Sequence, residues 1–174
     1  MRTLACLLLA GCAAAAPAPP SPDVRYEPTP MAVVGAMLEL AQVRANDVVY
    51  DLGCGDGRIV IEAARRYGAR GGCVDIDPRR IAEARANARQ EDLEEKIRFI
   101  EENLLETDLR DATVVMVFLS LDLNLRLRPK LLRELKPGAR VVSHWHRMGD
   151  WEPQKTVHAK GPYRSHEIFL WTIP

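Results

Sequence analysis

The sequence predicts one α/β domain with a doubly wound, mostly parallel sheet. Short apolar segments typical of strands alternate with segments of about 10–15 residues that have helical periodicity. A glycine-rich stretch at residues 51–57 lies directly between one such strand and one such helix. The chain has 174 residues, of which 47% are hydrophobic and 28% charged, so it is long enough to enclose one core.

The expected elements follow one another along the chain. Thr29 can cap a helix whose first residue is Pro30, and apolar residues at 34, 37, 38 and 41 share one face of that helix. Further predicted helices cover residues 59–67 and 78–90, and another around residues 131–135 ends at Lys136-Pro137-Gly138. Predicted strands cover residues 48–51, 71–76, 97–100, 114–119, 139–143 and 167–173. Because helices separate most of the strands, the pattern favours a parallel sheet covered on both faces.

Charge and cysteine content exclude several classes of protein. Lys and Arg total 24 and Asp and Glu total 24, so the net charge is zero and no nucleic-acid partner is expected. The four cysteines contain no C-x-x-C spacing, so neither a zinc ribbon nor a redox pair is indicated. Cys54 and Cys73 are expected to be small buried residues with reduced thiols.

The N-terminus predicts a targeting segment. Arg2 precedes an apolar run at residues 4–16, which is too short to span a bilayer and is typical of a signal peptide. Residues 9–12, Leu-Ala-Gly-Cys, resemble the bacterial lipoprotein processing box, which implies cleavage before Cys12 and acylation of its thiol. On this interpretation residues 1–16 are the signal, residues 17–25 a proline-rich tether, and residues 26–174 the folded domain. Any membrane contact is then through the lipid anchor at Cys12. The alternative is a start codon placed upstream of a cytosolic enzyme.

The glycine-rich stretch is the strongest functional signal. Gly53, Gly55 and Gly57 let the backbone turn and approach a ligand without a Cβ, next to free N–H groups of a helix start. A dinucleotide fingerprint requires glycine at position 58, which is Arg58, and Asp51 would repel a pyrophosphate. An acid at this strand end instead favours a positively charged ligand such as S-adenosylmethionine, which carries an ammonium and a sulfonium.

Here the sequence resembles the class I S-adenosylmethionine-dependent methyltransferases, whose first motif is D/E-x-G-x-G-x-G. The resemblance implies a Rossmann-like, mostly parallel sheet of the seven-stranded type, with S-adenosylmethionine as the cofactor. It also implies that Asp75, at the end of the second strand, accepts hydrogen bonds from the ribose while Ile76 packs against the adenine. Asn103 and Leu104 follow the third strand, where the family commonly has an acid that contacts the adenine amino group.

Three further motifs resemble a particular group of these enzymes. They are Tyr26-Glu27-Pro28-Thr29-Pro30, the stretch at residues 125–138, and the stretch from Val142-Ser143-His144 to Met148-Gly149-Asp150-Trp151. Together they resemble the small methyltransferases related to the mitochondrial enzymes that methylate lysine on adenine nucleotide translocase and ATP synthase subunit c. The resemblance implies N-methylation of a protein lysine, with a membrane-associated protein as one candidate substrate. It also implies that Tyr26, Thr29 and Pro30 cover the cofactor, and that Asp122 and Asn124 lie near the substrate.

A lysine amine must be neutral to attack the methyl carbon in line with the departing sulfur, whereas its ordinary pKa is about 10.4. A buried apolar slot lowers that pKa, and Ser120 or Asp122 could orient the amine. Ser120, Asp122 and Asn124 are therefore the catalytic candidates. Two alternatives stay open: a small-molecule methyltransferase, and a lipid-anchored nucleotide-binding protein without turnover. The second arises because S-adenosylmethionine is not expected outside the cytoplasm.

No metal site is expected. His144 and His146 alternate along a predicted strand, but no third ligand accompanies them, so ordinary packing is the simpler interpretation. Asp150 and Trp151 are interpreted as a loop anchor. The cations Arg126, Arg128 and Lys130 are interpreted as a solvated face or as a guide toward an acidic surface.

Overall fold

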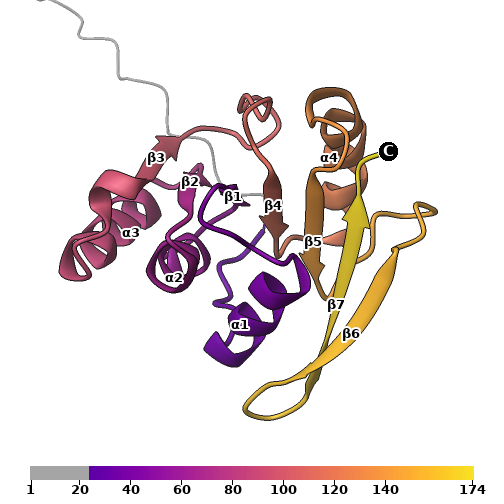
Figure 1. Cartoon of the computed structure of the whole chain (residues 1–174), viewed down its shortest axis with the longest axis horizontal. Helices are drawn as coiled ribbons and strands as arrows, with labels where there is room; N and C mark the ends of the chain where they lie inside the picture. The colour runs from indigo at the N-terminus through magenta and orange to yellow at the C-terminus, as the bar shows by residue number, and fades with distance from the viewer. Residues whose placement is uncertain (1–23) are drawn as a thin grey trace, which may run out of the picture.

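The computed structural model describes residues 24–174, and Figure 1 shows their arrangement. The predicted signal peptide, the lipoprotein-like box and all of the predicted tether except Val24 and Arg25 lie outside the described residues. Within residues 24–174 no helix is both long enough and apolar enough to cross a bilayer.

Helices and strands alternate as predicted. In chain order they are α1 (Met31–Leu40), β1 (Val48–Leu52), α2 (Arg58–Tyr67), β2 (Arg70–Asp75), α3 (Pro78–Gln90), a short 3-10 helix (Glu94–Lys96), β3 (Ile97–Glu101), β4 (Val114–Val117), α4 (Leu121–Glu134), β5 (Arg140–His144), β6 (Lys155–Lys160) and β7 (Ser165–Thr172). The predicted α/β class and single domain are confirmed.

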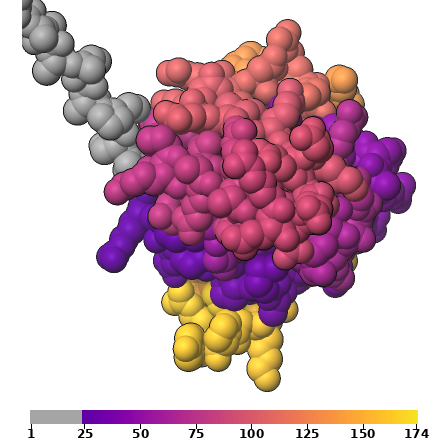
Figure 2. All heavy atoms as spheres, turned by 90° about the vertical axis from the view of Figure 1, so that its left-hand side faces the viewer, coloured from indigo at the N-terminus to yellow at the C-terminus, as the bar shows by residue number. Residues whose placement is uncertain are grey.

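The described strands form one sheet in the order β3-β2-β1-β4-β5-β7-β6. Strands β3, β2, β1, β4 and β5 run parallel, whereas β7 is antiparallel to β5 and β6 is antiparallel to β7. Strand β6 was not among the predicted strands, because this edge strand is mostly polar and exposed and so lacks an apolar signal. In Figure 2 the β6–β7 hairpin (yellow) projects beyond the rest of the molecule.

Helices cover both faces of the sheet, and strand β1 serves both layers. Val49 belongs to a buried cluster with α1, whereas Tyr50 and Leu52 point to the opposite face and pack in a cluster with α4. A third cluster joins α2 and α3 to β2. The parallel strands β1, β2, β4 and β5 are therefore buried on both sides, and the carboxyl ends of the five parallel strands meet at one edge of the sheet.

Two element boundaries differ from the predictions in ways that affect the site. Strand β4 ends at Val117, and α4 begins at Leu121 because the Ser120 hydroxyl accepts the N–H of Leu123 at 3.3 Å and caps the helix. Helix α1 begins at Met31 after an N-cap at Pro30 that has no side-chain cap. The predicted capping role of Thr29 is wrong, since its hydroxyl instead lies 3.3 Å from Nδ1 of His144.

Candidate active site

A cavity of about 280 Å³ lies at the carboxyl ends of β1, β2, β3 and β4. The chain proceeds from β1 to β2 and β3 on one side and returns to β4 on the other, so β1 and β4 mark the point where α/β sheets bind ligands. Most of the predicted cofactor residues line this cavity, namely Tyr26, Thr29, Asp51, Gly53, Asp75, Ile76, Asn103 and Leu104. Pro30, Gly55 and Gly57 are not among its lining residues.

Glycine is required in the loop after β1 for two separate reasons. Gly53, Gly55 and Gly57 have φ angles of +81°, +55° and +79°, which residues with a side chain rarely adopt. A Cβ on Gly55 would also lie 2.4 Å from Cε2 of Tyr26, and a Cβ on Gly57 would lie 2.9 Å from Cβ of Ala84 in α3. Gly55 thus lets the Tyr26 ring lie directly on the loop, and Gly57 lets the loop pack against α3.

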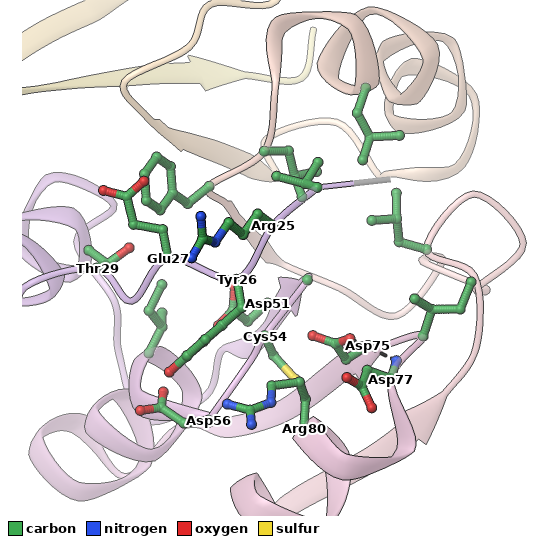
Figure 3. A pocket seen from close by; sticks show the side chains of 18 of the residues that line it. Arg25, Tyr26, Glu27, Thr29, Asp51, Cys54, Asp56, Asp75, Asp77 and Arg80 are labelled. Atoms are coloured by element: carbon green, nitrogen blue, oxygen red, sulfur yellow. Dashed lines mark hydrogen bonds between the residues drawn. The ribbon is translucent and has the colours of Figure 1, made fainter. Parts of the chain in front are cut away.

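The Asp75 carboxylate is fixed at the end of β2 by two backbone N–H groups. Oδ2 accepts the N–H of Gly55 and Oδ1 accepts the N–H of Asp77, each at 3.0 Å. The carboxylate therefore connects the glycine loop to the end of the neighbouring strand and faces the cavity, opposite Tyr26 (Figure 3).

Asp51 is the most perturbed acid of the cavity. Its side chain comes from the buried strand β1, and the residue is 3% exposed. Burial, reinforced by the charges of Asp75 and Asp56, raises the pKa of Asp51 from 3.8 to about 8. A buried carboxyl group that resists ionisation is stabilised by a positively charged ligand, so the site fits a cofactor that carries an ammonium group.

The segment before α1 is held across the cavity by side chains that were not predicted to belong to the site. Arg58 donates from Nη1 to the backbone oxygen of Thr29 at 2.9 Å and pairs with Asp56 at 2.5 Å. The Arg80 guanidinium lies 4.6 Å from the centre of the Tyr26 ring. Figure 3 shows Tyr26 crossing the cavity toward Asp56. The sequence identified Arg58 only as a departure from a dinucleotide fingerprint, and nothing local indicated its contact with Thr29.

Asn103 has less freedom than its predicted role requires. Its side-chain Oδ1 accepts the N–H of Leu105 at 3.0 Å and so holds the turn after β3. The residue lines the cavity, but one acceptor site of this oxygen is already used.

The three catalytic candidates do not lie together. Ser120 lines a second, adjoining cavity, whereas Asp122 is exposed on the first turn of α4 and lines neither cavity. Asn124 is fully buried, and its Nδ2 lies 3.3 Å from Ser143 Oγ and 3.2 Å from the backbone oxygen of His146. The predicted position of Asn124 near the substrate therefore needs correction. Because α4 begins early, Asn124 points into the protein and holds the end of β5.

Cys54 and Cys73 form a disulfide, with their Cα atoms 5.3 Å apart, so the prediction of reduced thiols is wrong. Strands β1 and β2 pair in parallel with Asp51 opposite Cys73, which brings the loop residue Cys54 against β2. Spacing along the sequence could not reveal this pair, because it depends on the register of two strands joined through a helix. Cys54 also lines the first cavity.

His144 and His146 do not lie side by side on one strand, and His144 instead packs against His166. Strand β5 ends at His144, and Trp145 follows with a φ of +71°, so His146 lies beyond the strand. Nε2 of His144 lies 2.8 Å from Nδ1 of His166 in β7. Among the described residues no group of three His, Cys, Asp or Glu side chains is arranged to hold a metal ion.

The loop anchor predicted at residues 150–151 is confirmed. Arg128 pairs with Asp150, and the indole N–H of Trp171 donates to the backbone oxygen of Trp151 at 2.7 Å. Lys130 does not belong to a solvated face, because it is 7% exposed and pairs with Glu134 at 2.8 Å.

This sheet order, glycine loop and pair of strand-end acids define the chain as a class I S-adenosylmethionine-dependent methyltransferase. The family model described as the ANTKMT methyltransferase domain matches residues 51–155. The chain belongs to this family.

Named relatives accompany the family match. A protein-lysine N-methyltransferase of Saccharolobus islandicus is 42% identical over 153 residues, which cover 87% of this chain and 95% of the relative. The adenine nucleotide translocase lysine N-methyltransferase of Mus musculus is 35% identical over 122 residues, 70% of this chain and 52% of that one. One similar crystal structure is described as an RNA methyltransferase from Salinibacter ruber in complex with S-adenosyl-L-homocysteine. It has a TM-score of 0.81 and 47% sequence identity to this chain, and the match covers 85% of this chain and 94% of that chain.

Proposed function

We propose that the chain is a protein-lysine N-methyltransferase. The observation that carries the cofactor half of this proposal is the buried carboxyl of Asp51 beside the fixed carboxylate of Asp75 in one cavity. The substrate half is supported by the 42% identical relative of nearly equal length, whose name specifies protein lysine. The balanced charge of the chain also supports a protein substrate over a polyanion such as RNA.

Each cofactor residue has a defined role in this proposal. Asp75 accepts hydrogen bonds from the ribose hydroxyls, and Asp51 pairs with the ammonium of the methionine portion. Ile76 and Leu104 pack against the adenine, and Tyr26 and Thr29 cover the bound cofactor. All of these residues line the cavity.

S-adenosylmethionine supplies an electrophilic methyl group bound to its sulfonium. The nitrogen lone pair of a neutral lysine amine forms the new N–C bond while the C–S bond breaks and its electrons stay on sulfur. The products are S-adenosylhomocysteine and a methylated ammonium. Burial of the amine lowers its pKa, and holding both partners in line supplies much of the rate.

The purified full-length chain is expected to transfer tritiated methyl groups from S-adenosylmethionine to lysine in total cell protein, detected as methyl-lysine after hydrolysis. Asp75→Ala should weaken S-adenosylhomocysteine binding about 10- to 100-fold and remove the label, since a hydrogen bond to a charged group contributes about 1.5–3 kcal/mol. Asp108→Ala, an exposed acid outside both cavities, is the matched control. Label found only in RNA, or only in the small-molecule fraction, would show that the substrate is RNA or a small molecule and not a protein lysine.

For the compartment, we propose that the chain is exported and anchored through Cys12. The lipoprotein-like box and the Cys54–Cys73 disulfide support this, because disulfides persist mainly in oxidising compartments. The requirement for S-adenosylmethionine, which is not expected outside the cytoplasm, argues instead for a cytoplasmic enzyme. Mass spectrometry of the chain isolated from cells should find a processed, acylated N-terminus in the membrane fraction. An intact N-terminus in the soluble fraction would place the enzyme in the cytoplasm.

A further inference from the structure

A second cavity of about 220 Å³ adjoins the cofactor cavity. The two cavities share the lining residues Val24, Arg25, Glu27, Phe118 and Leu119. Its other walls come from the ends of β4 and β5 and from the β6–β7 hairpin, and they are formed by Ser120, Trp145, His146, Arg164 and His166. The second cavity therefore lies directly beside the cofactor cavity, between the sheet edge and the hairpin.

We infer that this second cavity is the channel through which the substrate lysine reaches the cofactor, and that Trp145 and Arg164 position it. The inference rests on the proposed lysine methylation and adds the substrate site to it. No resemblance or relative described above assigns either residue.

Trp145 is held in an unusual conformation at the channel wall. Its φ of +71° is rare for a bulky residue, and its backbone N–H donates to the backbone oxygen of Glu167 in β7 at 2.9 Å. The Arg164 guanidinium lies 4.4 Å from the centre of the indole, and the His166 ring lies 5.2 Å away edge-on. Residues in sparsely populated backbone regions concentrate at functional sites, and here the hairpin holds the indole against the channel.

The channel walls suit the four-carbon stem of lysine. Phe118, Leu119 and Trp145 provide apolar surface along which such a stem can pack. Ser120 lies beside them with one lone pair used by the Leu123 N–H. The second lone pair can accept an amine N–H, which leaves the nitrogen lone pair free for the methyl carbon.

The charges around the channel favour a neutral amine. The lining carries two cations, Arg25 and Arg164, and one carboxylate, Glu27, which is largely exposed and lies 3.9 Å from Arg164. Beneath the wall, burial lowers the pKa of His144 to about 4, so this imidazole is uncharged at neutral pH, between Thr29 and His166. The two lining cations outnumber the one lining carboxylate, Glu27, and this net positive charge together with low polarity lowers the pKa of a lysine that enters, which increases its reactive form.

The test measures methylation of poly-L-lysine by the full chain together with S-adenosylhomocysteine binding. Trp145→Ala should raise KM for poly-L-lysine about tenfold, with kcat and the Kd for S-adenosylhomocysteine each changed less than about twofold. Arg164→Ala should shift the pH profile of kcat/KM upward by roughly half a unit, because removal of a like charge raises the pKa of the amine. Tyr67→Ala and Arg65→Ala, on α2 and outside both cavities, are the matched controls and should change neither quantity.

The outcomes separate the two proposals. An active wild-type enzyme whose KM is unchanged by Trp145→Ala and whose pH profile is unchanged by Arg164→Ala would overturn the channel and leave lysine methylation intact. A wild-type enzyme that binds S-adenosylhomocysteine but forms no methyl-lysine on poly-L-lysine or on total protein would overturn both. Arg164 lies in the exposed hairpin turn, so its variant stays informative if Trp145→Ala fails to fold.

Discussion

Lowering the pH from 8 to 6 is expected to weaken S-adenosylhomocysteine binding by about fiftyfold, because the ionised fraction of Asp51 falls from about one half to about one hundredth. Burial raises the pKa of Asp51 to about 8, so the free enzyme holds this carboxyl protonated below that pH. The ammonium of the ligand requires the ionised form, and binding therefore releases a proton. Above pH 8 Asp51 is mostly ionised, so the affinity should stop rising until the α-amino group of the ligand loses its own charge at higher pH. Affinity should therefore rise from pH 6 to about pH 8 and level off above it.

The same residue acts in the opposite direction on the stability of the free protein. The pKa of Asp51 is higher in the folded chain than its ordinary value of 3.8, so the folded state keeps a proton that the unfolded state has lost. Its contribution to stability is therefore complete below pH of about 4 and is lost as the pH rises to about 8. A bound ammonium offsets this loss, so the stabilisation by ligand should increase with pH over this window.

Calorimetry in two buffers of different ionisation enthalpy measures the proton release directly. The Asp51→Asn variant should bind S-adenosylhomocysteine more weakly than the wild-type enzyme at pH 8. Its affinity should not change between pH 8 and pH 6. The ligand 5′-methylthioadenosine has no ammonium, so its affinity for the wild-type enzyme should likewise not change between pH 8 and pH 6. Equal affinity of the wild-type enzyme for S-adenosylhomocysteine at pH 6 and pH 8 would show that Asp51 does not pair with the ammonium.

Local sequence determines much of this fold and most of its cofactor side. Helix α3 covers the predicted residues, and it begins at Pro78 because Asp77 accepts the N–H of Arg79 at 2.9 Å and proline suits the first helical position. Asp51 and Asp75 could be placed in one cavity from sequence, because both end parallel strands and such ends share an edge of the sheet.

Contacts between distant segments could not be predicted in the same way. The position of Asn124 depends on where α4 begins, and the Ser120 cap was hidden in a run that resembles the end of a strand. The channel combines Trp145 with Arg164 from a hairpin whose first strand, β6, has almost no apolar pattern. The substrate side of the site is therefore the part that required three-dimensional information.

Replacing Cys54 and Cys73 together by alanine is expected to lower the free energy of unfolding by about 3 kcal/mol. The disulfide joins residues 19 positions apart, and closing a loop of that size stabilises a protein by about 3 kcal/mol through the entropy of the unfolded chain. In a domain of this length the change corresponds to a Tm lower by roughly 6–12 °C. Thermal unfolding with and without reductant measures it, and the double variant should no longer respond to reductant.

The disulfide also holds the part of the loop that forms the cofactor site, so its loss should affect binding as well as stability. Cys54 lies between Gly53 and Gly55, and the N–H of Gly55 fixes the carboxylate of Asp75. Without the bond, the loop must be ordered when the ligand binds, at a cost of about 1–2 kcal/mol per residue fixed, so S-adenosylhomocysteine should bind about tenfold more weakly. Two results together would show that the bond does not form. The Tm and the affinity of the wild-type protein would not respond to reductant, and the thiols of Cys54 and Cys73 would react with alkylating agents after unfolding without reductant. The order of the site would then rest on its noncovalent contacts, such as those of Gly55, Tyr26 and Asp75, and the case for an oxidising compartment would rest on the N-terminal box.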